Sequence, residues 1–322
     1  MNWPLCAIAT VALVALPFVY HGAYPLHILV LILIWSFAYT SWSVMGRFGL
    51  VSLGHGGFMG IGAYVTALLW NYWHLTPWLG IPVAMLAAAV MALLIGYPCF
   101  RFRITGHYFA LLTLALSAIA LQVITATRDV TGGSLGYTAE RWQGGSSLYA
   151  LQFLGKETWY LIALGVWALG PLILWRVDRS MLSHALEAIA EDEDAAAAIG
   201  VNVTVEKLKI TVLSATMTGL AGGIYCQYQM FISPDTVSGI AVSLQMVFAA
   251  VLGGLYVPLG PTVGATITIL ATELLRIWFG TGAVGWDNLV YGILLVVVII
   301  FLPQGLLGPL RARLRPRQSR VA

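Results

Sequence analysis

Charged residues are scarce in this chain of 322 residues. The 16 Lys and Arg and the 13 Asp and Glu make up 9% of the sequence, whereas soluble domains hold about a quarter. Hydrophobic residues make up 60%, and the mean hydropathy is +0.87. Apolar runs of roughly 17–25 residues, the length that crosses a bilayer, recur along the chain. This composition excludes a sizeable soluble domain and predicts an all-α polytopic membrane protein.

Cysteine is also scarce, and the motifs of several enzyme classes are missing. Cys6, Cys99 and Cys226 are scattered and show neither metal-ligand spacing nor a disulfide framework, so we expect buried, apolar thiols. No His and Glu cluster has metal spacing, and no Walker A motif is present. We therefore expect no catalytic residue, no bound metal and no ATP hydrolysis by this chain.

The apolar runs predict about ten membrane-spanning helices. The first is read as a retained helix, because it lacks the basic start and the cleavage site of a signal peptide. Whether the spans at 48–70 and 242–276 are broken helices stays open, and the second region fits either a tight turn or a helix that re-enters. The predicted spans cover residues 3–20, 26–45, 48–70, 78–97, 106–126, 157–175, 208–231, 242–256, 260–276 and 285–303.

The placement of Lys and Arg predicts the orientation, because these residues are enriched in cytoplasmic loops. An N-in/C-in arrangement puts twelve of the sixteen on the cytoplasmic side and four outside. Residues 1–310 then form a single transmembrane domain, with an external loop at 127–156 and a cytoplasmic loop at 176–207. The basic tail at 311–322 is expected near anionic lipid headgroups, with no nucleic acid as a partner.

The cytoplasmic loop is predicted to contain one short amphipathic helix over residues 184–200. Its residues are strong helix formers, its apolar residues recur three and four apart, and Gly200 supplies a stop. One interpretation is a solvated acidic helix. The other is a docking helix, since the small alanines at 195–198 would let a groove on a partner approach closely. The alanine run favours docking.

The third span contains the glycine-rich stretch VSLGHGGFMGIGAY, residues 51–64. Gly56 and Gly60 form a G-x-x-x-G step, which lets membrane helices pack closely. Alternatively, the helix is interrupted near mid-membrane, where unpaired backbone groups survive only inside protein or along a wet cavity. We expect a mixture of the two. The candidate residues of a translocation pathway here are Ser52, His55, Gly56 and Gly57.

An intramembrane enzyme that uses Ser52 and His55 is a distant alternative. The two residues share one helix face, but a serine nucleophile needs a base from another element and an oxyanion hole. At the outer end of the fifth span, VTGGSLG is either a turn or part of an outer mouth. If it forms the mouth, the candidate residues are Thr131, Gly132, Gly133 and Ser134.

Five motifs together resemble one family of transport proteins. They are GLVSLGHGGFMGIGAY (49–64), GHYFALLTLALS (106–117), VTGGSLG (130–136), AIAEDEDAAAAIGVNV (188–203) and VLGGLYVPLGPTVGA (251–265). They are similar to motifs of the branched-chain amino acid permeases of ATP-binding-cassette (ABC) importers, the LivH/LivM type, and closest to the LivM subunit. One departure is TGGSLG, where the family often has Asp after the serine.

The resemblance implies a type II ABC-importer permease-like bundle in the bacterial cytoplasmic (inner) membrane, with no cofactor of its own. Two cytoplasmic ATPase subunits would use ATP to drive alternating access. A second homologous permease chain, an external substrate-binding protein and membrane lipid would be the other partners. Branched-chain or other small amino acids are the default substrates, with urea, short amides or aromatic acids as alternatives. The implied ATPase-coupling residues are Ala188, Glu191, Asp192, Ala195, Ala196 and Gly200.

Overall fold

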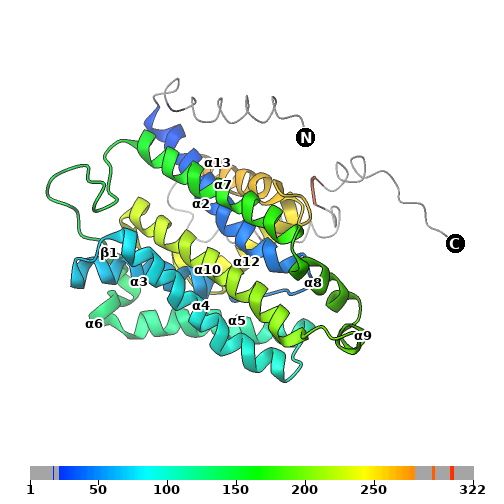
Figure 1. Cartoon of the computed structure of the whole chain (residues 1–322). Helices are drawn as coiled ribbons and strands as arrows, with labels where there is room; N and C mark the ends of the chain where they lie inside the picture. The colour runs from blue at the N-terminus through cyan, green and yellow to red at the C-terminus, as the bar shows by residue number, and fades with distance from the viewer. Residues whose placement is uncertain (1–16, 18–21, 280–291, 294–304, 308–322) are drawn as a thin grey trace.

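The computed structural model describes residues 17, 22–279, 292–293 and 305–307. Apart from residues 17 and 292–293, the predicted spans at 3–20 and 285–303 lie outside the described residues, as does the basic tail at 311–322. Within the described part, the long helices lie side by side in one bundle (Figure 1). They are α2 (Ala23–Gly46), α3 (His55–Trp73), α4 (Pro77–Arg101), α5 (Gly106–Ala126), α7 (Lys156–Asp178), α10 (Val203–Gln229), α12 (Ile240–Gly253) and α13 (Gly260–Phe279).

The bundle is organised around α2 and α10, which contact each other. Helix α10 also packs against α3 and α4, and α2 packs against α7, α12 and α13. Buried Trp42 and Tyr39 on α2 belong to the main core. By contrast, α4 and α5 turn apolar side chains such as Leu86 and Leu111 outward, where they are more than half exposed. Such outward apolar faces are typical of helices that border lipid.

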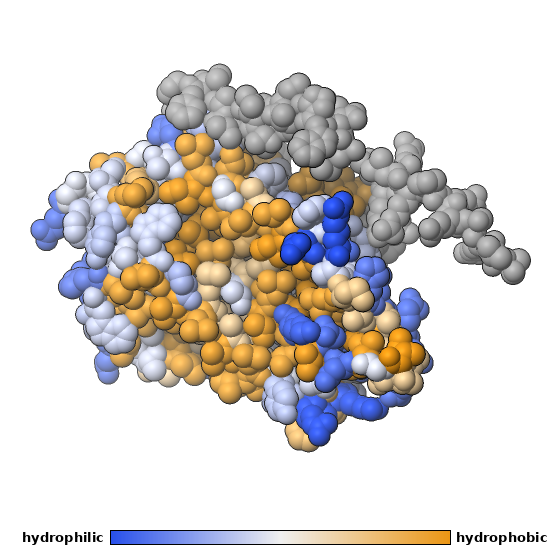
Figure 2. Space-filling view, in the orientation of Figure 1, coloured by the Kyte–Doolittle hydropathy of each residue, from blue (hydrophilic) through white to orange (hydrophobic). Residues whose placement is uncertain are grey.

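Five described helices are long and apolar enough to cross a membrane: 23–46, 77–101, 106–126, 156–178 and 234–253. Helices α3 and α10 lie in the same bundle but do not reach this hydropathy, because glycine and polar residues dilute their apolar content. The surface shows a broad hydrophobic band, with hydrophilic side chains gathered toward the ends of the bundle (Figure 2). The described chain is thus a multi-pass membrane protein.

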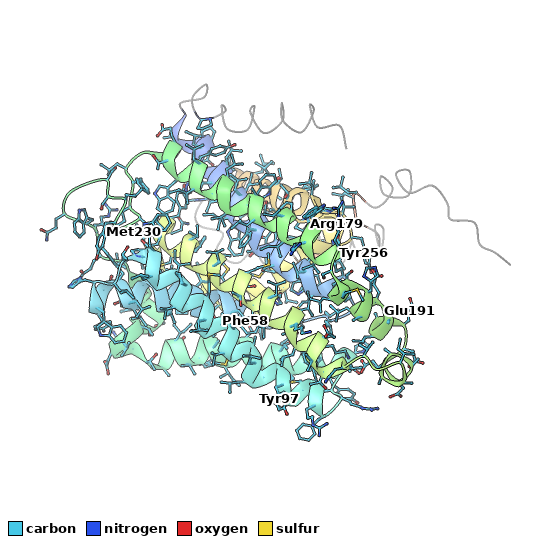
Figure 3. The ribbon with its side chains drawn as sticks, viewed as in Figure 1. Phe58, Tyr97, Arg179, Glu191, Met230 and Tyr256 are labelled. Atoms are coloured by element: carbon cyan, nitrogen blue, oxygen red, sulfur yellow. The ribbon has the colours of Figure 1, made fainter. Side chains whose placement is uncertain are left out.

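The two ends of the bundle carry different short elements. At one end, called here the ribbon end, lie α6 (Arg128–Thr131), η1 (Gly133–Leu135), β1 (Tyr137–Thr138) and, next to α10, β2 (Phe231–Ile232) and α11 (Pro234–Val237). At the opposite end, the α9 end, lie α8 (Met181–Glu191) and α9 (Glu193–Ala198) (Figure 1). Met230 and Glu191 mark these two ends in Figure 3.

The two-stranded ribbon is a departure from the all-helical expectation. Tyr137 pairs with Ile232 and Thr138 with Phe231 in antiparallel register. The loop after η1 therefore satisfies backbone groups by pairing with the segment after α10.

The region 242–276 resolves to a tight turn between α12 and α13. Gly254 accepts a hydrogen bond from Val257, which in turn accepts one from Gly260. A Cβ atom on Gly253 would collide with the carbonyl oxygen of Gly260, and one on Gly264 with that of Ala249. The glycines thus let the two helices form a closely packed hairpin.

Candidate functional site

The glycine-rich stretch begins as a non-helical segment. Helix α3 starts at His55, so the predicted start of this span at residue 48 is wrong; the chain turns after α2 and stays non-helical through residue 54. The backbone of this segment is satisfied by side chains: Trp42 Nε1 donates to Ser52 O at 2.7 Å, and Leu53 N donates to Thr113 Oγ1 at 3.0 Å. The interruption thus precedes α3, and it is tolerated because protein surrounds it.

The first turn of α3 is held by hydroxyl groups from two other helices. Gly56 N donates to Ser243 Oγ at 2.9 Å, and Ser243 Oγ lies 3.0 Å from Ser117 Oγ. This serine pair connects α12 with α5 and caps an amide that has no partner within its own helix.

The glycines of α3 differ in what a side chain would meet. A Cβ on Gly56 would collide with Gly239 O, and one on Gly60 would lie 2.8 Å from Ser238 Cβ. A Cβ on Gly57 would lie 3.4 Å from the Ala120 side chain, an ordinary contact. Close approach of neighbouring elements therefore requires glycine at 56 and 60 but not at 57.

His55 sits in a fully buried polar cluster that joins α2, α3 and α10. Its Nε2 lies 2.7 Å from Ser214 Oγ, which donates to Ser41 O at 2.6 Å, and Ser41 Oγ lies 2.7 Å from Thr218 Oγ1. Because a hydroxyl has one hydrogen and Ser214 gives it to Ser41, His55 must donate from Nε2. Its Nδ1 is then an acceptor, and it has no partner in the described part of the chain. Ser52 is likewise buried.

The stretch 130–136 forms a turn at the ribbon end. Thr131 is buried; its Oγ1 donates to Ile124 O at 2.5 Å and accepts from Gly133 N at 3.2 Å. Gly132 and Gly133 both have positive φ, and a Cβ on Gly132 would collide with Gly136 O, so glycine is needed for the turn. Ser134 is exposed beside them.

The letters Gly132-x-Ser134-x-Gly136 also match the spelling of a hydrolase nucleophile elbow. That motif needs a strand before the serine and a base within hydrogen-bond reach. Here a single helical turn, α6, precedes it, and no hydrogen bond between Ser134 and a histidine occurs among the described residues. The spelling is therefore coincidental.

The loop at the α9 end holds two helices where one, over residues 184–200, was predicted. Asp192 is extended and ends α8, and its carboxylate then accepts from Asp194 N and Ala195 N to cap α9. An aspartate side chain competes well for free helix amides, which explains the break. Gly200, at φ 94°, ends α9; the hydrogen bond from Val201 N to Ala196 O closes a Schellman turn.

The alanine run divides between two faces of α9. Ala196 is buried against the rest of the chain, whereas Ala195, 197 and 198 are exposed. Ile199, directly after them, is 79% exposed. The exposed surface of Ala195, Ala197, Ala198 and Ile199 is called the α9 face below. Of the other predicted coupling residues, Glu191 and Gly200 are exposed, and Ala188 packs on the core.

Ion pairs hold α9 against the bundle. Lys207 in α10 is buried and pairs with Glu193 at the start of α9. Arg103, after α4, pairs with Asp194 at 2.9 Å. A groove of about 340 Å³ lies between these elements. It is lined by Phe100, Arg101, Arg103, Glu193, Asp194, Ala197 and residues 200–204.

Sequence reasoning missed several residues of these sites. The start of α3 is contacted by Ser214 and Ser243, and the segment just before it by Thr113. Single hydroxyl residues in apolar spans gave no signal for such contacts. Lys207 was counted only toward orientation. Its spacing of seven from Ser214 places both on one helix face, and that pattern was available in the sequence.

Comparison with known proteins gives one consistent result. Residues 24–299 match the family described as branched-chain amino acid transport system / permease component. The chain is 32% identical over 292 residues to the high-affinity branched-chain amino acid transport system permease protein LivM of Escherichia coli (strain K12), covering 84% of this chain and 67% of LivM. It is 24% identical over 261 residues to a probable LivH permease of Methanocaldococcus jannaschii, covering 77% of this chain and 80% of that one.

A more distant match comes from another transport system. The autoinducer 2 import system permease protein LsrC of Enterobacter sp. (strain 638) is 25% identical over 238 residues, covering 68% of this chain and 63% of LsrC. The matching proteins are thus permeases whose names give more than one kind of substrate.

Proposed function

The chain belongs to the family of branched-chain amino acid transport permeases, and on this premise we propose that it is the permease subunit of an ABC importer for branched-chain or other small amino acids. Members of this family are membrane transport subunits and not enzymes. The finer statements below concern energy coupling, the pathway, the partners and the substrate.

The α9 face is the observation that carries the proposal. A short helix held beyond the hydrophobic band by ion pairs turns only Ala196 into the bundle and leaves the α9 face, with Ile199, exposed. Exposed apolar surface at the end of a membrane bundle fits docking to another protein. We assign this face to a cytoplasmic ATPase subunit, one of two that would clamp on ATP and drive alternating access.

The cluster around His55 is proposed as part of the translocation pathway. Ser52 and His55 are buried here, so the pathway is closed at their level in this structure. They would become accessible when α3 separates from α10, whose Ser214 holds His55. Intramembrane polar groups are costly to keep and are often functional, which supports this assignment.

The ribbon end is proposed as the external face, where a substrate-binding protein would deliver its ligand. Ser134 and Leu135 are exposed there beside the buried Thr131. A second, homologous permease chain would complete the pore in the bacterial inner membrane. A membrane-impermeant thiol reagent added outside should label Ser146→Cys at the ribbon end and should leave His184→Cys on α8 unlabelled; the reverse pattern would invert this orientation.

Reconstitution tests the function directly. The chain would be assembled with its ATPase subunits, second permease chain and binding protein in vesicles, and uptake of labelled leucine would be measured with and without ATP. We expect ATP-dependent uptake that isoleucine and valine inhibit. Inhibition by urea, a short amide or an aromatic acid instead would change the substrate class, and the absence of ATP-dependent uptake of any of these would contradict the proposal.

A further inference from the structure

The ion pairs at the α9 end differ in burial. The Lys207 side chain is 4% exposed, whereas the Lys209 side chain, which pairs with Glu206 in the same helix, is 56% exposed, and both side chains of the Arg103–Asp194 pair lie at the surface. A lysine is almost never buried this deeply without a partner, because an unpaired ammonium loses its hydration at a cost of several kcal/mol. Glu193 supplies that partner, and the Phe100 ring centre lies 6.0 Å from Lys207 Nζ. The Lys207–Glu193 pair therefore fixes the position of α9 relative to α10 more strongly than a surface ion pair would.

The pair also joins two elements that the chain alone connects loosely. Glu193 is the first residue of α9, and Lys207 lies in the second turn of α10. Between them the chain makes the Schellman turn at Gly200 and a new helix start capped by Asn202. A shift of α9 away from α10 would have to separate the two charges and leave Lys207 unpaired.

One face of α10 continues from this pair to the polar cluster. Lys207, Thr211, Ser214 and Thr218 are spaced by four, three and four residues, which places them on the same face. Thr211 Oγ1 donates to Lys207 O at 2.8 Å, Ser214 contacts His55, and Thr218 contacts Ser41. A rigid helix thus connects the ion pair with the groups that hold the start of α3.

We infer that the Lys207–Glu193 ion pair is the joint through which movement of α9 reaches α10 and, through Ser214, the His55 cluster. The inference rests on the proposed function, because an ATPase must move α9. Lys207 is then a positioning residue that touches neither substrate nor partner.

The test is the amount of substrate transported per ATP hydrolysed, measured in the complete reconstituted complex. Lys207→Met keeps the volume that packs near Phe100 and leaves Glu193, whose side chain is 34% exposed, free to be hydrated. We expect this ratio to fall by about fivefold or more, while ATP hydrolysis continues. Lys207→Arg, which retains the charge, should stay within about twofold of the wild-type ratio.

Two further variants separate coupling from folding. Lys209→Met removes an exposed lysine that pairs with Glu206 in the same region and should leave the ratio within about twofold. Glu193→Gln breaks the joint from the α9 side and should lower the ratio as Lys207→Met does. The double variant Lys207→Met/Glu193→Gln should not lower the ratio further than the more impaired of the two single variants does, because both substitutions break the same ion pair. Because the ratio is taken per ATP hydrolysed, a lower yield of folded complex does not imitate the effect.

A wild-type ratio in both Lys207→Met and Glu193→Gln, in a complex whose uptake is ATP-driven, would overturn the inference and leave the proposed function standing. A loss of the ratio in Lys209→Met equal to that in Lys207→Met would also overturn it, because burial would then play no part. No ATP-driven uptake by the wild-type complex would instead remove the proposed function.

Discussion

The glycines of α3 and the alanines of α9 are both runs of small residues, yet the structure uses them differently. On α3, a side chain at Gly56 or Gly62 would collide with the backbone of another element of the same chain. On α9, only Ala196 is buried, and Ala195, 197 and 198 are exposed. The same sequence pattern thus indicates internal packing in one region and a free surface in the other. The two uses are distinguished by whether other parts of the chain occupy the space that a larger side chain would fill.

The largest expected effect is at the glycines of α3. Gly56→Leu places a branched side chain against Gly239 O, and overpacking against backbone costs roughly 1–3 kcal/mol or more, so we expect the yield of folded protein to fall about tenfold. Size-exclusion chromatography of the detergent-extracted protein measures this yield. Gly165→Leu on α7, where a Cβ meets nothing within 4 Å, is the matched control and should keep a normal yield. Equal yields of the two variants would contradict the packing account.

Arginine substitutions are expected to have different effects at the buried and the exposed alanines of α9. Ala196→Arg buries an unpaired charge within the chain, at a cost of about 3–5 kcal/mol, and should lower the folded yield. Ala198→Arg points to solvent and should fold normally, but it should reduce transport per ATP by about tenfold, because the charge blocks the proposed contact. If Ala198→Arg transports with the wild-type ratio, the α9 face does not dock the ATPase.

The polar cluster is expected to show a smaller effect. His55→Ala removes the hydrogen bond to Ser214, whose own donor bond to Ser41 remains, so the bundle should still assemble while transport falls about fivefold. His55→Cys should be unreactive toward a hydrophilic thiol reagent at rest and should react during turnover. Thr66→Cys, buried on the same helix, should stay unreactive in both conditions. An unreactive cysteine at 55 during turnover would reduce the cluster to a packing role.

The smallest effect is expected at Gly200, where the packing of the described residues does not require glycine. No atom lies within 4 Å of an added Cβ, but the φ of 94° disfavours any other residue. Gly200→Ala should therefore destabilise the protein by about 1 kcal/mol, seen as a small decrease in Tm, while Gly165→Ala should not. A Tm for Gly200→Ala equal to wild type would show that the α9 turn relaxes freely.

Much of the bundle could be predicted from the sequence, because apolar length and proline placement determine membrane helices. The helix at 106–126 was predicted with the bounds of α5, and the spans at 26–45, 78–97 and 157–175 were placed within a few residues of α2, α4 and α7. The start of α3 was missed because side chains from two other helices, Trp42 of α2 and Thr113 of α5, satisfy the backbone of the non-helical segment before it. The break at Asp192 was missed because a cap residue was read as part of an acidic helix.

The candidate sites were less accessible to sequence reasoning. The motifs around residues 51–64 and 188–203 located the two regions, and the structure then showed which side chains within them meet. Whether an alanine faces inward depends on the rotation of a six-residue helix, which short apolar patterns do not determine. The hydrogen-bond partner of His55 comes from α10 and is itself bonded to Ser41 of α2, and no local pattern links these residues.

The most direct test of the central claim is site-specific photocrosslinking from α9 in the assembled complex. A photoactivatable reagent attached to Ala198→Cys, in a background without the native cysteines, should form a covalent product with an ATPase subunit. The same reagent at Gly165→Cys, exposed on α7, should not. A product at both positions, or at neither, would contradict the assignment of the α9 face as the surface through which ATP drives this permease.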